Sequence, residues 1–132
     1  MPRELPVILT EIRSAARKGT SADQVARVRA AERDRILAAI PSGSVKVALD
    51  EHGTMMTTSQ LADRLEGWMN HGRDICFLIG GADGLDEAIK DGADFVFSLS
   101  RLTMPHALVR VVLAEQLYRA MSVTRNHPYH RE

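Results

Sequence analysis

The chain has 132 residues, of which 45% are hydrophobic and 26% are charged. This length suits one compact domain with its own core, and the composition is that of a globular protein, neither disordered nor fibrous. We therefore expect a single domain over residues 1–132. No apolar stretch is long enough to span a bilayer, and residues 1–9 carry charge and two prolines where a signal peptide is apolar, so we expect a cytoplasmic protein.

The chain carries 17 basic and 17 acidic residues, so its formal net charge is zero. That balance argues against a general polyanion binder with a wide positive surface. RNA binding remains open, because basic and histidine side chains gather in two clusters. These are Arg13, Arg17 and Lys18 in the first, and Arg125, His127, His130 and Arg131 in the second. Either cluster alone is better explained as ordinary solvated surface.

The first half of the chain alternates between predicted strands and helices. Residues 5–12 form a short apolar, β-branched run that predicts a strand. Residues 22–40 are rich in Ala, Arg, Glu and Val and end at a Pro-Ser-Gly stop signal, which indicates a helix. Residues 45–49 predict a second strand, and residues 50–53 predict the loop that leaves it.

The next helix has a clear start and one apolar face. Thr57 and Gln60 have the spacing of a capping box, and Gly72 is expected to end the helix. Four apolar residues then fall on one side of it, namely Leu61, Leu65, Trp68 and Met69.

Residues 75–79 are apolar without alternation, the pattern of a strand covered on both faces in a parallel sheet. The single cysteine, Cys76, lies in this run and is expected to be a buried structural thiol. Residues 85–91 predict a short helix, and residues 94–99 predict a fourth strand.

A last helix is predicted over residues 105–120, starting at Pro105. It is apolar around most of its circumference, with Arg110 and a Glu115–Arg119 pair as its polar stripe, so we expect it to be largely buried. Strands that alternate with helices predict an α/β fold with a mainly parallel sheet and helices on both faces. In such folds, ligands bind beyond the carboxyl ends of the strands.

Two candidate binding segments follow predicted strands. Gly80, Gly81 and Gly84 sit between a strand and a helix, where glycine lets a ligand approach the backbone; a tight turn without a ligand explains them equally well. The spacing is neither GxGxxG nor GxxxxGK[ST]. The second segment, residues 98–106, carries Ser, Thr and His, and helix capping with Thr103 before Pro105 is an equal alternative for its hydroxyls.

The C-terminal residues 126–132 are polar, aromatic and titratable. His127 and His130 lack a third ligand motif nearby, so we expect no metal site. Nucleophilic catalysis has little support, because no GxSxG motif is present and Cys76 is expected to be buried.

Read together, the segments FLIGGADGL, SLSRLTMPHALVRVVLAEQLYRA and TRNHPYHRE resemble the RlmH family of SPOUT-class methyltransferases, which modify N3 of a pseudouridine in large-subunit (23S) ribosomal RNA. The similarity is close over residues 45–132 and looser back to residue 5. The resemblance implies a SPOUT-type α/β fold with a C-terminal trefoil knot, a topology that no pattern argument would propose. It also implies a homodimer and the cofactor S-adenosylmethionine.

The family's site positions carry over residue by residue. The resemblance implies cofactor binding by Leu49, Gly81, Leu99, Ser100, Arg101, Leu102, Thr103 and Met104. It implies catalytic positions at His106, Tyr129, His130 and Arg131. Uracil N3 must lose a proton, so we expect His130 or Tyr129 to handle it and Arg131, with Arg119 as a further candidate, to stabilise the anionic base or a phosphate.

The chain departs from the family pattern in two places. Ala82 stands where a proline is usual, which should loosen the turn without removing the site. Family members usually have a further strand and helix before the segment that matches Met1, so the domain looks N-terminally shortened and a sheet edge is expected to be unpaired.

Two other function classes are weighed against a methyltransferase. A non-catalytic RNA-binding or ribosome-associated module of the same fold would bind no S-adenosylmethionine. A nucleotide-dependent enzyme using residues 80–84 for phosphates lacks the expected lysine. The near-zero net charge favours recognition of an assembled ribosome over naked RNA.

Overall fold

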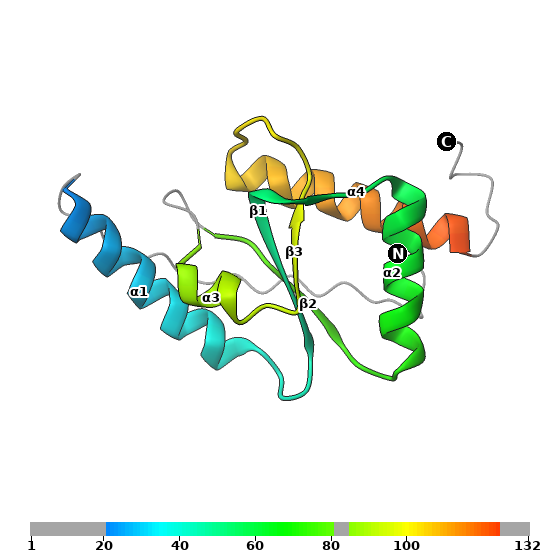
Figure 1. The fold of residues 1–132 in the computed structure, drawn as a ribbon, viewed down its shortest axis with the longest axis horizontal. Coiled ribbons are helices and arrows are strands. Elements are labelled where there is room, and N and C mark those ends of the chain that lie inside the picture. Colours follow the sequence, from blue (N-terminus) through cyan, green and yellow to red (C-terminus); the bar gives the residue numbers. More distant parts are fainter. Residues whose placement is uncertain (1–20, 81–84, 125–132) are drawn as a thin grey trace.

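The computed structural model describes residues 21–80 and 85–124. Helices and strands alternate along them (Figure 1) in the order α1 (Ala22–Ala39), β1 (Val45–Met55), α2 (Thr58–Asn70), β2 (Ile75–Leu78), α3 (Glu87–Asp91), β3 (Phe95–Ser98) and α4 (His106–Thr124). The strand predicted over residues 5–12 lies outside the described residues.

The described strands form one parallel sheet in the order β2-β1-β3. Val45 to Ala48 of β1 pair in register with Ile75 to Leu78 of β2, and β3 pairs on the other side of β1. The central position of β1 explains why most of its first half is buried. The predicted parallel α/β architecture is confirmed; the trefoil knot stays a prediction.

Each face of the sheet is covered by a different pair of helices (Figure 1). Val45, Val47 and Leu49 point to one face, where they pack with apolar residues of α2 and α4. Ala48 points to the other face and packs with Ile36 of α1 and with apolar residues in and before α3. The period-two alternation of β1 therefore builds two cores, and the predicted helices on both faces are confirmed.

The capping box predicted for α2 is present. The Thr57 hydroxyl accepts from the Gln60 amide at 3.1 Å, and the Gln60 side chain accepts from the Thr57 amide at 2.8 Å. At the other end, Gly72 adopts a φ of 69° and its amide donates to the Met69 carbonyl at 2.9 Å, which ends the helix as predicted.

Three local expectations need correction. The short helix starts at Glu87 instead of residue 85, because the side chain of Asp86 caps it by accepting from the Ala88 amide. Cys76 is only partly buried, since β2 lies at one edge of the described sheet. The last helix continues to Thr124, four residues beyond its predicted end.

The prediction that the last helix is largely buried is wrong for residues 106–112, none of which is buried. Leu113 and Leu117 lie in the core, whereas Leu108 is 45% exposed and Val111 is 66% exposed. A helix that is apolar all round does not reveal which side meets the sheet, and here only one side does. The Glu115–Arg119 pair is confirmed, with Arg119 Nη2 2.6 Å from Glu115 Oε1. Within residues 21–80 and 85–124, no helix is both long and apolar enough to cross a membrane.

Residues 50–53 are not the loop that we predicted after β1, because the strand continues to Met55. The pairing shows how these residues are accommodated. Leu49 and Thr54 both pair with Phe97 of β3, so the four residues between them leave the register. We call residues 50–53 the bulge. It carries Asp50, Glu51 and His52 out of the ladder at the carboxyl end of the sheet.

Candidate functional site

A pocket of about 470 Å³ lies beyond the carboxyl ends of β2 and β3, next to the bulge of β1. Its walls come from the bulge, from Ile79 and Gly80 after β2, from the loop after β3 and from the start of α4. Arg29 of α1 and residues at α3 close another side. The position beyond the strand ends is where parallel α/β folds bind ligands.

The structure brings most of the described candidate site residues to this pocket. The lining includes Leu49, Leu99, Ser100, Leu102, Thr103, Met104 and His106. Arg101 does not line the pocket; its Nη1 donates to the Glu51 carbonyl at 2.6 Å. Gly81, Tyr129, His130 and Arg131 lie outside the described residues.

Residues 99–104 form the loop between β3 and α4, which we call the 99–104 loop. The Ser100 hydroxyl accepts from the Leu102 amide at 2.9 Å. The Thr103 hydroxyl donates to Oε2 of Glu51 at 3.1 Å. The Ser98 hydroxyl, which is buried, lies within hydrogen-bond distance of the Glu51 and Ser100 carbonyls. These three hydroxyls thus organise the loop and join it to the bulge.

One wall of the pocket carries a network of charges. Lys90 Nζ lies 2.9 Å from Glu87 Oε1 and 3.5 Å from Asp50 Oδ1. Burial lowers the pKa of the Lys90 ammonium, but the hydrogen bond to Glu87 and the negative charges of Asp50 and Glu87 outweigh this effect and raise the pKa above its ordinary value. The pocket wall therefore keeps a positive charge flanked by two carboxylates.

Sequence reasoning missed this polar wall. Asp50, Glu51 and His52 were expected in an ordinary loop, and Lys90 was not singled out. Their place directly after a predicted strand was the available signal, because strand ends in a parallel sheet meet at one edge. His52 is 82% exposed, with its Nδ1 3.5 Å from Asp50 Oδ2.

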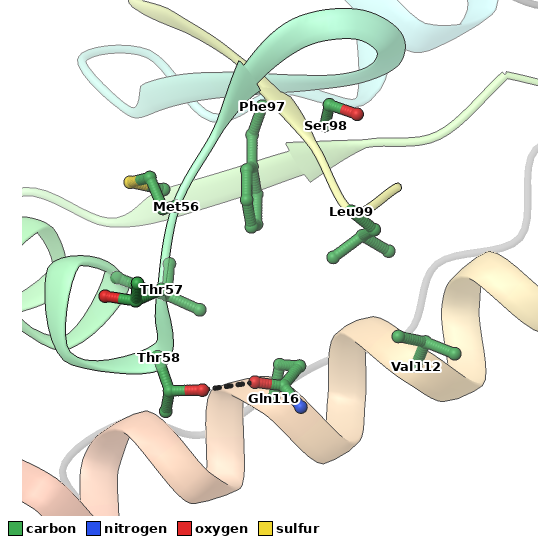
Figure 2. Close-up of a pocket in the computed structure, with 9 residues that line it drawn as sticks. Met56, Thr57, Thr58, Phe97, Ser98, Leu99, Val112 and Gln116 are labelled. Atoms are coloured by element: carbon green, nitrogen blue, oxygen red, sulfur yellow. Dashed lines mark hydrogen bonds between the residues drawn. The ribbon is translucent and has the colours of Figure 1, made fainter. Parts of the chain in front are cut away.

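A second, smaller cavity of about 130 Å³ lies between the start of α2, β3 and α4 (Figure 2). Thr58 Oγ1 donates to Gln116 Oε1 at 2.8 Å across its lower side, and Leu99 lines both cavities. This volume is well below the range of about 300–1,000 Å³ typical of cofactor sites. The larger pocket is therefore the candidate functional site.

Arg119 lies apart from both cavities. Its guanidinium Nε and Nη2 donate to Glu115 Oε1 at 3.0 and 2.6 Å on α4. Among the residues that the structure describes, Arg119 lines neither cavity.

Comparison with known proteins connects this architecture to a family. Residues 1–130 match the family described as "Predicted SPOUT methyltransferase". The chain is 56% identical over 132 residues to the ribosomal RNA large subunit methyltransferase H of Burkholderia ambifaria, covering 99% of this chain and 83% of that protein. Proteins of the same name from Burkholderia vietnamiensis and Thiobacillus denitrificans are each 54% identical and are also covered over 83% of their length. The chain belongs to the SPOUT methyltransferase family.

Proposed function

We propose that this protein transfers the methyl group of S-adenosylmethionine to N3 of a pseudouridine in 23S ribosomal RNA. One observation carries the proposal: Leu49 and the 99–104 loop, far apart in sequence, line one pocket of about 470 Å³ at the carboxyl ends of parallel strands. That volume falls in the range of about 300–1,000 Å³ expected for a cofactor. The relatives' names, ribosomal RNA large subunit methyltransferase H, support the choice of substrate.

The residues present suit S-adenosylmethionine. Leu49, Leu99 and Leu102 offer apolar surface, while the carboxylate of Asp50 suits the hydroxyls and the positive charge of the cofactor. When bound, the cofactor supplies an electrophilic methyl group, and its sulfur keeps the electron pair of the broken bond. The chain would provide the binding surface and hold the methyl group in line with the base.

The pseudouridine must lose its N3 proton before or while the bond between N3 and the methyl carbon forms. We propose His130 or Tyr129 for this proton and Arg131 for the developing negative charge on the base. His106, at the start of α4, lines the pocket and is the described residue that we propose to face the RNA base. Arg119 is a weaker candidate, because Glu115 already pairs with its charge.

We also propose that the protein works as a homodimer. On α4, Ala107, Leu108, Val111 and Ala114 share one exposed side of the helix. An exposed apolar stripe of this kind marks an interaction surface. In a dimer, the C-terminal residues of one protomer would complete the site of the other.

Calorimetry with S-adenosylmethionine tests cofactor use. Micromolar binding with release of heat, not displaced by ATP, is expected. A chain that binds the RNA but not the cofactor would be a non-catalytic module, and displacement by ATP would favour a nucleotide-dependent enzyme.

Transfer of a labelled methyl group identifies the substrate. We compare transfer to assembled ribosomes, free large subunits and purified rRNA, and we expect transfer to an assembled particle to exceed transfer to purified rRNA, because the net charge of zero gives little general attraction to naked RNA. The substrate also makes the bacterial cytoplasm the expected compartment. Equal transfer to purified rRNA would contradict the preference for an assembled particle.

A further inference from the structure

We propose that Glu51 is a positioning residue for the 99–104 loop, which it holds in the shape that binds the cofactor. The inference rests on the proposed function, in which this loop binds S-adenosylmethionine. Glu51 belongs to the bulge, and the sequence pattern does not identify it as a candidate site residue. The role of Glu51 follows from its place in the tertiary structure, where β1 leaves its register beside β3.

Glu51 contacts the segment that contains this loop through both its backbone and its side chain. Its carbonyl accepts from Arg101 Nη1 at 2.6 Å and from Ser98 Oγ at 3.1 Å. Its carboxylate Oε2 accepts from Thr103 Oγ1 at 3.1 Å. The contacts therefore hold the last residue of β3 and two residues of the loop, from a position about fifty residues away in the chain.

The loop needs such contacts because it has little support of its own. It contains no regular helix or strand, and Arg101, Leu102 and Thr103 are exposed, Leu102 to 76%. A loop left free would lose conformational entropy when a cofactor ordered it. Contacts that order the loop beforehand reduce that loss and so strengthen binding.

Glu51 acts through Thr103 and not on the reacting atoms, because its Oε2 already accepts from the Thr103 hydroxyl. Two substitutions separate this acceptor role from the charge. Glu51→Gln keeps an oxygen that accepts from Thr103, whereas Glu51→Ala removes it.

The test measures the Kd for S-adenosylmethionine by calorimetry in the full chain. Glu51→Ala is expected to raise Kd about tenfold, and Glu51→Gln less than about threefold, because one net hydrogen bond to the loop is lost only in the first. Glu66→Ala, which removes an exposed carboxylate from α2, is the matched control and should leave Kd unchanged. An equal loss with Gln and Ala would overturn the acceptor role.

A double-mutant cycle with Thr103→Val tests the partner. If Glu51 acts through Thr103, the double variant with Glu51→Ala should bind no more weakly than the worse single variant. A merely structural role of Glu51 would give losses that multiply. Multiplied losses would overturn the proposal.

Hydrogen exchange measured without cofactor separates this inference from the proposed function. Amides of residues 101–104 should exchange at least about tenfold faster in Glu51→Ala than in the unchanged chain, while amides of α2 keep their rates. If the unchanged chain fails to bind S-adenosylmethionine, the proposed function fails, and the exchange rates still judge the positioning role. Unchanged exchange in the loop would overturn it.

Discussion

Gly53 lies so close to Val96 that a Cβ added to it would be 2.7 Å from the Val96 carbonyl oxygen and 2.8 Å from its carbonyl carbon. Side-chain Cβ atoms essentially never approach other atoms so closely, and a backbone neighbour cannot rotate away. Gly53 is the last residue of the bulge, one residue before Thr54 of β1 pairs with Phe97 of β3. A glycine at position 53 is therefore a condition for the bulge that carries Asp50, Glu51 and His52 to the pocket.

Gly53→Ala is expected to lower the free energy of unfolding by about 2 kcal/mol, because β1 and β3 must move apart to admit the methyl group. The bulge would shift with them, so binding of S-adenosylmethionine should weaken as well. Urea denaturation and calorimetry measure the two effects. Gly67→Ala is the matched control: Gly67 lies in α2 with no atom within 4 Å of an added Cβ, and the change should stabilise the protein by about 0.5–1 kcal/mol. Unchanged stability of Gly53→Ala would show that the strands separate at little cost.

Lys90 should make stability depend on alkaline pH. Folding raises the pKa of Lys90, so the folded state holds this proton more tightly than the unfolded state, and the stabilisation is complete below the ordinary pKa of 10.5. It is lost as the pH rises through the higher pKa of the folded state. The free energy of unfolding should exceed that of Lys90→Met by about 1 kcal/mol near neutral pH, and the excess should shrink above pH 10.5. Urea denaturation of both proteins, from neutral pH to above the ordinary lysine pKa, measures this difference in the free energy of unfolding. A difference that does not change with pH would contradict the predicted effect of the Lys90 pKa.

Val111→Glu tests the exposed stripe of α4. Val111 is 66% exposed, so a carboxylate there should leave the fold intact but prevent an apolar face from pairing with its copy. Sedimentation should show a dimer for the unchanged chain and a monomer for the variant. Leu37→Glu is the control, because Leu37 is 50% exposed on α1, away from this stripe, and should leave the dimer intact. If Val111→Glu forms a dimer with an unchanged dissociation constant, the dimer interface lies elsewhere.

His130→Ala tests the proposed proton acceptor. Loss of a general base should reduce methyl transfer by about a hundredfold or more, while the Kd for S-adenosylmethionine stays the same. Tyr129→Phe, measured in parallel, distinguishes the two candidates. His71→Ala supplies the control, since this exposed histidine follows α2 and its Nδ1 bonds locally to the Gly67 carbonyl. Full activity of His130→Ala would exclude His130 as the base.

The candidate site was only partly predictable. Leu49 and the 99–104 loop followed from a family resemblance, and the structure brings Leu49 and five of the six loop residues to the pocket lining. Glu51 and Lys90 were missed, because their importance depends on what lies opposite them in space. No local pattern shows that Thr103 donates to Glu51, 52 residues away.

Local structure was determined by the sequence itself. The Thr57–Gln60 capping box and the helix end at Gly72 both depend on neighbours within a few residues, which is why their patterns were sufficient. The tertiary structure alone decided the bulge and the exposed side of α4. Phe97 pairs with two residues of β1, and only one side of α4 packs against the sheet. The local sequence allows other arrangements equally well, and packing between distant segments selects these two.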